Sequence, residues 1–264
     1  MKERVITGFF GALFLLSVVY IGGYVFTGAV ILIAIVAMYE TLRMKGLPIV
    51  SPMSFIGMFM MMALLLPDNW WESWSWFTSW EWFVIGVFLL FLCTVLTKNF
   101  RTYDDAGFVT ISAIYIGYGF HHLLVARAVE ETGFLLVLLI LFLIWSTDTG
   151  AYFVGKTWGR RKLWPAISPK KTLEGSIGGI GTALFVGILF YSFFPLFPSF
   201  WQLLLFVFII SIFGQVGDLV ESALKRHVQV KDSGTILPGH GGILDRFDSL
   251  LFVMPILYFF QLLG

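Results

Sequence analysis

Long apolar runs recur along the whole chain, and they limit strongly what it can fold into. Nine stretches approach or reach the length that an α-helix needs to cross a bilayer. With boundaries good to a few residues, they cover roughly 4–21, 24–40, 53–67, 82–98, 107–127, 134–154, 176–195, 200–224 and 248–263. The chain is 58% hydrophobic and only 12% charged, with a mean hydropathy of +0.89, which excludes an ordinary soluble protein.

The predicted fold is therefore all-α, a polytopic transmembrane bundle of about nine helices. No segment shows the alternation of a membrane β-barrel. Only Gly22-Gly23 divides the first two runs and the third run is short, so eight or ten helices remain alternatives. We expect one integral membrane domain over 1–264, with N-terminal helices in 1–130. Residues 131–264 would supply the helices and cytoplasmic loops that carry the chemistry.

The distribution of cations predicts a cytoplasmic N-terminus. With nine helices and that orientation, sixteen of the 17 Lys and Arg residues fall inside, and only Arg127 falls outside. This asymmetry is what the positive-inside rule requires, and a miscounted helix would disturb it. The resulting basic cytoplasmic face would attract lipid headgroups and polyphosphates.

The polar stretch 222–248 lies between two apolar runs, where ionisable side chains usually have a function. On the preceding helix, Asp218, Glu221, Ser222 and Lys225 follow i, i+3, i+4, i+7 spacing and share one face. Asp245 and Asp248 repeat the i, i+3 spacing, although stabilisation of a helix start is an alternative for that pair.

Hard oxygen ligands from several helices suit Mg²⁺. Asp148, inside an apolar run, and Glu221 are secondary candidates for the metal site, after Asp218, Asp245 and Asp248. Whether a second, monovalent cation joins the Mg²⁺ is open.

Cations accompany these carboxylates. The segment 168–175 offers Lys170 and Lys171 for phosphate contacts and Thr172 as a helix start, although a purely topogenic role is the alternative for the two lysines. Residues 238–242 supply a glycine-rich loop that can approach a ligand closely. The small residues Gly175, Gly178, Gly179 and Gly181 predict close helix packing. Together these groups indicate phosphoryl or nucleotidyl transfer on a lipid.

Residues 222–248 resemble the signature of the phosphatidate cytidylyltransferases, also called CDP-diacylglycerol synthases. The matching positions are Ser222, Lys225, Arg226, Lys231, Asp232, Gly234, Pro238, His240, Gly241, Gly242, Asp245, Arg246 and Asp248. The segments 148–152 and 168–175 are similar to that family as well. The resemblance covers the C-terminal half closely and the remainder through its architecture.

The resemblance implies a Mg²⁺-dependent reaction of CTP with phosphatidate that forms CDP-diacylglycerol and pyrophosphate. It assigns the metal centre to Asp218, Asp245 and Asp248. Phosphate and headgroup contacts would come from Lys170, Lys171, Lys225, Arg226, Lys231 and Arg246. Ser168, Ser222, His240, Gly241 and Gly242 are the remaining substrate-binding candidates, and His240 with its glycines would shape the phosphate loop.

Two alternatives belong to other classes. A CTP-dependent lipid-alcohol kinase would release CDP instead of pyrophosphate, and a lipid or ion transporter would use the intramembrane carboxylates as ion sites. We expect the bilayer, CTP and phosphatidate as partners, a homodimer as the resemblance suggests, and no nucleic acid. The predicted location is a prokaryotic inner membrane, with the site on the cytoplasmic side.

Overall fold

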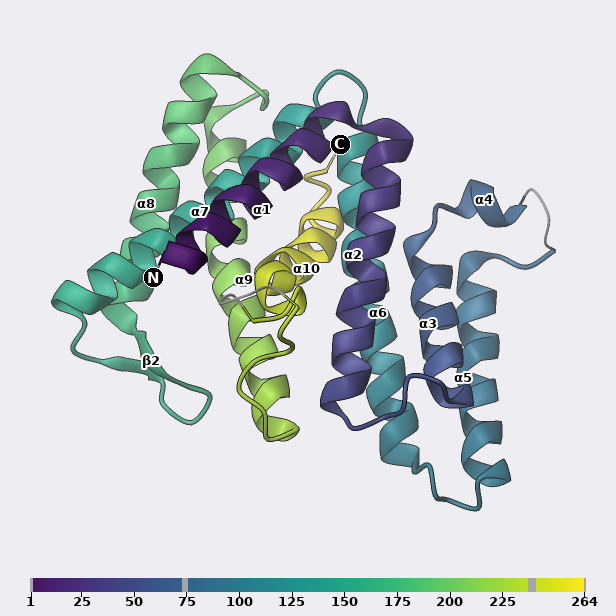
Figure 1. Cartoon of the computed structure of the whole chain (residues 1–264). Coiled ribbons are helices and arrows are strands. Elements are labelled where there is room, and N and C mark those ends of the chain that lie inside the picture. Colours follow the sequence, from purple (N-terminus) through teal and green to yellow (C-terminus); the bar gives the residue numbers. More distant parts are fainter. Residues whose placement is uncertain (1, 73–75, 237–240, 264) are drawn as a thin grey trace.

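Helices dominate the computed structural model, which describes residues 2–72, 76–236 and 241–263 (Figure 1). The helices are α1 (Lys2–Ile21), α2 (Gly23–Met44), α3 (Pro52–Leu65), α4 (Asp68–Glu72), α5 (Ser79–Leu96), α6 (Tyr103–Ala128), α7 (Gly133–Trp158), α8 (Leu173–Phe193), α9 (Phe200–His227) and α10 (Leu244–Phe259). Apart from the five-residue α4, each matches a predicted run to within about four residues at either end. The predicted helical bundle is confirmed.

Not every helix is long enough to cross a bilayer by itself. Among the described residues, six helices are sufficiently long and apolar, namely α2, α5, α6, α7, α8 and α9. Helix α1 has 20 residues, of which Thr7–Ile21 form an apolar stretch, and α3 and α10 have 14 and 16 residues. Within the part of the chain that the structure describes, six of the nine predicted runs therefore meet the full length requirement, and the cytoplasmic position of the N-terminus stays a prediction.

The helices form an elongated bundle in which α2, α6 and α10 occupy the middle (Figure 1). The pair α3 and α5 packs at one end, against α6, and α7, α8 and α9 pack at the other. Large buried side chains such as Phe120 and Phe206 fill the interior. The C-terminal helix α10 contacts α2, α6, α7 and α9, so it connects the two ends.

Arg127, predicted as the single outside cation, has a structural role at the turn between α1 and α2. Its guanidinium donates to the carbonyl oxygens of Val19 at 2.8 Å and Tyr20 at 3.4 Å, which satisfies acceptors at the C-terminal end of α1. Gly22 has a φ of 67°, and a side chain there would collide with the guanidinium. The exception to the charge asymmetry therefore has a local explanation.

A small β-hairpin is the feature that the helical prediction missed. Strand β1 (Lys162–Trp164) pairs antiparallel with β2 (Ser168–Thr172), with Lys162 opposite Thr172 and Trp164 opposite Ser168. The sequence of this segment predicts no strand, because strands of three and five residues are too short to show a period. The hairpin holds both lysines of the basic segment beside α7 and α9.

Candidate active site

A cavity of about 510 Å³ lies between α7, the hairpin, α8 and α9. Its lining includes three lysines, two carboxylates and a few neutral polar groups; the charged members are Asp148, Lys156, Lys170, Lys171 and Asp218. Segments far apart in the sequence therefore bring opposite charges to one concave surface. This is the kind of place where a polar ligand binds.

Close packing of α7 against α8 shapes one wall of this cavity. A Cβ atom on Gly175 or Gly179 would come within 2.7 Å of a carbonyl oxygen of α7. Helix α8 begins at the predicted position, because the Thr172 side chain accepts a hydrogen bond from the Gly175 N–H at 3.2 Å. The predicted close packing is confirmed at Gly175, Gly178 and Gly179, but it is wrong for Gly181, which faces open space.

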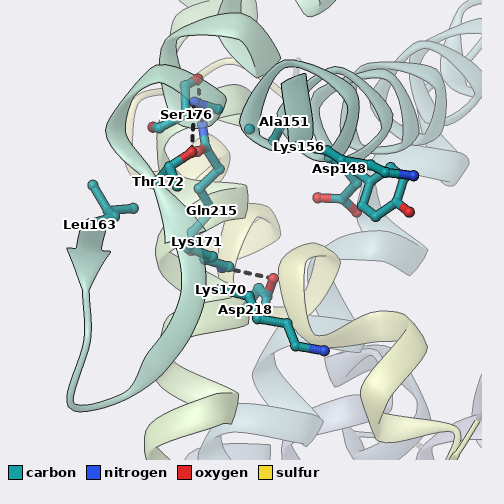
Figure 2. A pocket seen from close by; sticks show the side chains of 13 residues that line it. Asp148, Ala151, Lys156, Leu163, Lys170, Lys171, Thr172, Ser176, Gln215 and Asp218 are labelled. Atoms are coloured by element: carbon teal, nitrogen blue, oxygen red, sulfur yellow. Dashed lines mark hydrogen bonds and ion pairs between the residues drawn. The ribbon is translucent and has the colours of Figure 1, made fainter. Parts of the chain in front are cut away.

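An ion pair crosses the cavity from the hairpin to α9. Figure 2 shows Lys171 of β2 reaching Asp218, and the two charged groups are 2.7 Å apart. The same ammonium donates to the carbonyl oxygen of Gln215 at 3.4 Å. Lys170 and Lys156 are exposed in the cavity wall. The ion pair thus fixes one lysine of the basic segment, while the other two remain accessible to an anion.

Asp148 lines this first cavity and also a second one. The second cavity, of about 500 Å³, lies between α1, α7 and α10 and is mainly apolar, with Phe14, Ile144 and Trp145 among its lining residues. Its polar end carries Asp148 together with Asp245, Arg246 and Asp248. Two cavities with charged groups and apolar walls therefore share a wall at one carboxylate.

Three carboxylates from three helices face each other near this shared wall. Asp148 of α7, Asp218 of α9 and Asp248 of α10 each lie within electrostatic range of the other two, so their charges repel. Arg246 and Lys171 are close enough to Asp148 to offset part of this repulsion. Within the described residues, no group of three or more His, Cys, Asp or Glu side chains is placed to hold a metal ion.

The ammonium group of Lys225 lies between two buried or nearly buried carboxylates. It is 2.5 Å from Glu221 one turn earlier on α9, and 2.6 Å from Asp245 at the start of α10. The Glu221 side chain is 1% exposed and that of Asp245 is 7% exposed. The predicted shared helix face of Glu221 and Lys225 is confirmed, and the cation joins α9 to α10.

The carboxylate of Asp245 also anchors the loop before α10. One oxygen, Oδ2, accepts from the N–H groups of Ser233 and Gly242 at 3.0 and 2.8 Å and from the Ser233 hydroxyl at 2.9 Å. Gly241 has a φ of 80°, and a Cβ atom there would lie 2.6 Å from Oδ2. Asp245 thus stabilises the start of α10, which is the alternative that the sequence left open for this residue. Its role as a metal ligand stays a prediction.

Only some of the remaining predicted residues contact this centre. Ser222 donates to Asp218 at 3.3 Å, and the main-chain oxygen of Asp248 accepts from the hydroxyl of Tyr115 at 2.9 Å. Arg226 and Lys231 are exposed, and neither they nor Ser168 line either of the two cavities. His240 is outside the described residues.

Sequence reasoning missed four residues that complete the site. Gln215 lines the first cavity, and Tyr115 holds the first turn of α10. Ser233 binds Asp245 through both its N–H and its hydroxyl. Glu40 reaches the same loop from α2. The one available signal was for Glu40, a carboxylate at the end of an apolar run.

Comparison with known proteins now decides the family. A model of the Cytidylyltransferase family matches residues 2–263. The chain belongs to this family. It is 48% identical over 261 residues to a phosphatidate cytidylyltransferase of Bacillus subtilis (strain 168), which covers 98% of this chain and 97% of that protein. Proteins with the same name in Staphylococcus haemolyticus (strain JCSC1435) and Staphylococcus aureus (strain COL) are 41% and 40% identical, over 97% of both chains.

As a family member, the chain places its signature at the contact between α9, α10 and the loop that connects them. The signature residues Lys225, Asp245 and Gly242 contact one another directly or through one partner. The contacts of Asp245 with Lys225 and with the N–H of Gly242 therefore join three signature positions in one cluster.

Proposed function

We propose that this protein is a phosphatidate cytidylyltransferase, which converts CTP and phosphatidate to CDP-diacylglycerol and pyrophosphate. The observation that carries the proposal is the likeness to relatives of that name over nearly the full length of both chains. The arrangement of charged groups is suited to this chemistry, because both substrates are phosphate anions and both must approach one site.

The cavity beside the hairpin is the proposed CTP site. Its lysines provide positive charge for a triphosphate, and Lys156 and Lys170 are accessible in its wall. Gln215 and Ser176 add neutral polar groups to the same lining. The apolar walls of this cavity are interrupted by these groups, which is the composition expected of a site for a charged small molecule.

The second cavity is the proposed phosphatidate site. Its walls on α1 and α7 are apolar and suit acyl chains, and Arg246 at its polar end suits the phosphate headgroup. Asp148 lines both cavities, so the two phosphates would meet beside it. An oxygen of the phosphatidate phosphate would attack the α-phosphorus of CTP, while the bond from that phosphorus to the β-phosphate oxygen breaks and pyrophosphate leaves.

The protein's own groups would act chiefly by alignment and charge neutralisation. The attacking phosphate is already an anion, so no strong general base is needed. Lys170 and Arg246 would hold the two phosphates, since they line the two cavities that share Asp148. The buried pair of Lys225 with Asp245 would fix the start of α10, and with it the position of Arg246.

The donor chemistry fits Mg²⁺, because carboxylate oxygens are its preferred protein ligands. Mg²⁺ keeps several waters and commonly uses one or two carboxylates together with substrate phosphates, so a complete protein cage is not required. One or two of Asp148, Asp218 and Asp248 would hold the ion together with the substrate phosphates, and its charge would relieve the mutual repulsion of the three carboxylates. When bound, Mg²⁺ supplies neutralisation of the CTP phosphates and of the leaving pyrophosphate.

The finer location and assembly are also proposals. We place the site on the cytoplasmic side of a prokaryotic inner membrane, which the predicted 16-to-1 cation asymmetry supports. A homodimer follows from the family resemblance.

Purified protein with phosphatidate, Mg²⁺ and CTP tests the activity directly. With label on the α-phosphate of CTP, we expect labelled CDP-diacylglycerol; with label on the γ-phosphate, we expect labelled pyrophosphate and an unlabelled lipid. Transfer of the γ-phosphate to a lipid alcohol would show a kinase instead. Failure of the purified, folded protein to make either product would contradict both activities.

A further inference from the structure

Glu40 is a buried carboxylate that none of the signature segments contains. It lies near the C-terminal end of α2, its residue is 1% exposed, and no Lys or Arg side chain forms an ion pair with it among the described residues. A buried charge without a cation must be compensated by hydrogen bonds. The donors that compensate Glu40 are about 200 residues away in the sequence.

Two N–H donors at the start of α10 point to this carboxylate, and the single hydroxyl hydrogen of Ser233 is shared between it and Asp245. The N–H groups of Ile243 and Leu244 donate to its two oxygens at 3.0 Å each. The hydroxyl of Ser233 lies 3.3 Å from Oε2. Ile243 and Leu244 begin α10, where free N–H groups and the helix dipole favour a negative charge.

Ser233 connects Glu40 to the catalytic centre. Its hydroxyl is 3.3 Å from Glu40 and 2.9 Å from Asp245, and Asp245 in turn binds Lys225 at 2.6 Å. The two carboxylates therefore hold opposite sides of the same loop. A shift of Glu40 would move the first turn of α10, which carries Asp245 and Asp248.

The signature glycines fit around these two carboxylates. A Cβ atom on Gly234 would collide with Glu40 Oε1, and one on Gly242 would lie 2.5 Å from Glu40 Oε2. The glycine-rich loop was predicted to let its backbone approach a ligand. At Gly234 and Gly242, the group that approaches so closely is Glu40 of the protein itself.

We infer that Glu40 is a positioning residue for the cytidylyl transfer: it fixes the signature loop and the start of α10 so that Asp245 and Lys225 are correctly placed. The inference rests on the proposed function. Glu40 lines neither cavity, so it acts through other residues and does not contact substrate. The loop requires an acceptor there, and a carboxylate is the side chain that offers two oxygens and no competing donor.

Steady-state kinetics of Glu40→Ala and Glu40→Gln test this role. Misplacement of catalytic groups by about 1 Å lowers rates by roughly a hundredfold, so we expect Glu40→Ala to lower kcat by about that factor. The KM values should change by no more than about threefold, because the cavity linings are intact. Glu40→Gln keeps one acceptor oxygen and should retain an intermediate kcat. Wild-type kcat in both variants would overturn the inference.

Thr41→Val is the matched control. Thr41 is the next residue on α2, it is equally buried, and its hydroxyl donates only to Ala37 within the helix at 2.8 Å. We expect its kinetics to remain near wild type. A loss of kcat in Thr41→Val equal to that in Glu40→Gln would reduce the effect to general packing of α2 and overturn the inference.

Two further measurements keep the inference testable if Glu40→Ala folds poorly or if the proposed function is wrong. In a double-mutant cycle, Glu40→Gln and Ser233→Ala should lower kcat by less than the product of their separate factors, and a purely multiplicative result would contradict the shared loop contact. Without any substrate, hydrogen exchange of the peptide 241–247 should be faster in Glu40→Gln than in wild type or Thr41→Val. Unchanged exchange would overturn the positioning role, whereas absence of CDP-lipid in the wild type would contradict only the proposed function.

Discussion

Lys225→Met offers a quantitative test of the charge arrangement at the junction of α9 and α10. The wild-type ammonium lies 2.5 Å from Glu221 and 2.6 Å from Asp245, and its own side chain is 14% exposed. With Lys225, the trio of formal charges sums to −1; without it, two buried carboxylates face each other with a charge of −2. Breaking a buried ion pair by removing one partner costs about 3–5 kcal/mol, so we expect the variant to lose that much stability.

Neutralisation of Glu221 in the same chain should return much of the lost stability. In Glu221→Gln/Lys225→Met, only Asp245 remains charged, and it keeps three hydrogen bonds from the loop. We expect the double variant to be more stable than Lys225→Met by roughly half or more of the loss, because the uncompensated charge has been removed.

Unfolding by SDS titration in mixed micelles, followed by tryptophan fluorescence, measures these differences. The single variant Glu221→Gln serves as the control for the amide itself. If Lys225→Met were as stable as wild type, or if the double variant were less stable than Lys225→Met, the compensation argument would be refuted.

Three other outcomes follow from the site. Gly242→Ala should reduce kcat at least tenfold and destabilise the fold by about 1–3 kcal/mol, since its Cβ atom would meet Glu40 and Ser233; normal kinetics would show that the loop adapts. Lys170→Ala should raise the KM for CTP by roughly tenfold because a charge-assisted phosphate contact is lost, whereas Lys162→Ala on the same hairpin, outside the cavity lining, should leave it unchanged in the same assay. EDTA should stop CDP-lipid formation and added Mg²⁺ should restore it, so continued turnover in chelator would contradict the metal proposal.

Hydropathy alone located the helices well, because a membrane helix needs a long apolar run that is visible in one dimension. The pairing of Glu221 with Lys225 followed from helical spacing, which is also local. Asp148 was singled out because a carboxylate inside an apolar run is costly, and the structure places it in the lining of both cavities. These predictions required no knowledge of which helices are neighbours.

The missed contact of Glu40 depends on distant segments. Glu40 is 203 residues from Ile243, and no local pattern indicates that the two meet. The hairpin was overlooked because each strand is short and gains its hydrogen bonds only from its partner. The glycines of the loop were recognised as a group, but their individual reasons depend on the carboxylates of Glu40 and Asp245, which only a three-dimensional structure brings together.

The bond between Glu40 and the start of α10 has a consequence for biosynthesis. A ribosome makes Ile243 and Leu244 about 200 residues after Glu40, so the carboxylate lacks these donors while the intervening chain is made. Contacts of such large sequence separation form slowly, because the intervening chain must first be ordered. Chains interrupted before residue 243 would keep an uncompensated carboxylate in α2. Synthesis of the start of α10 therefore supplies the donors that make burial of Glu40 favourable.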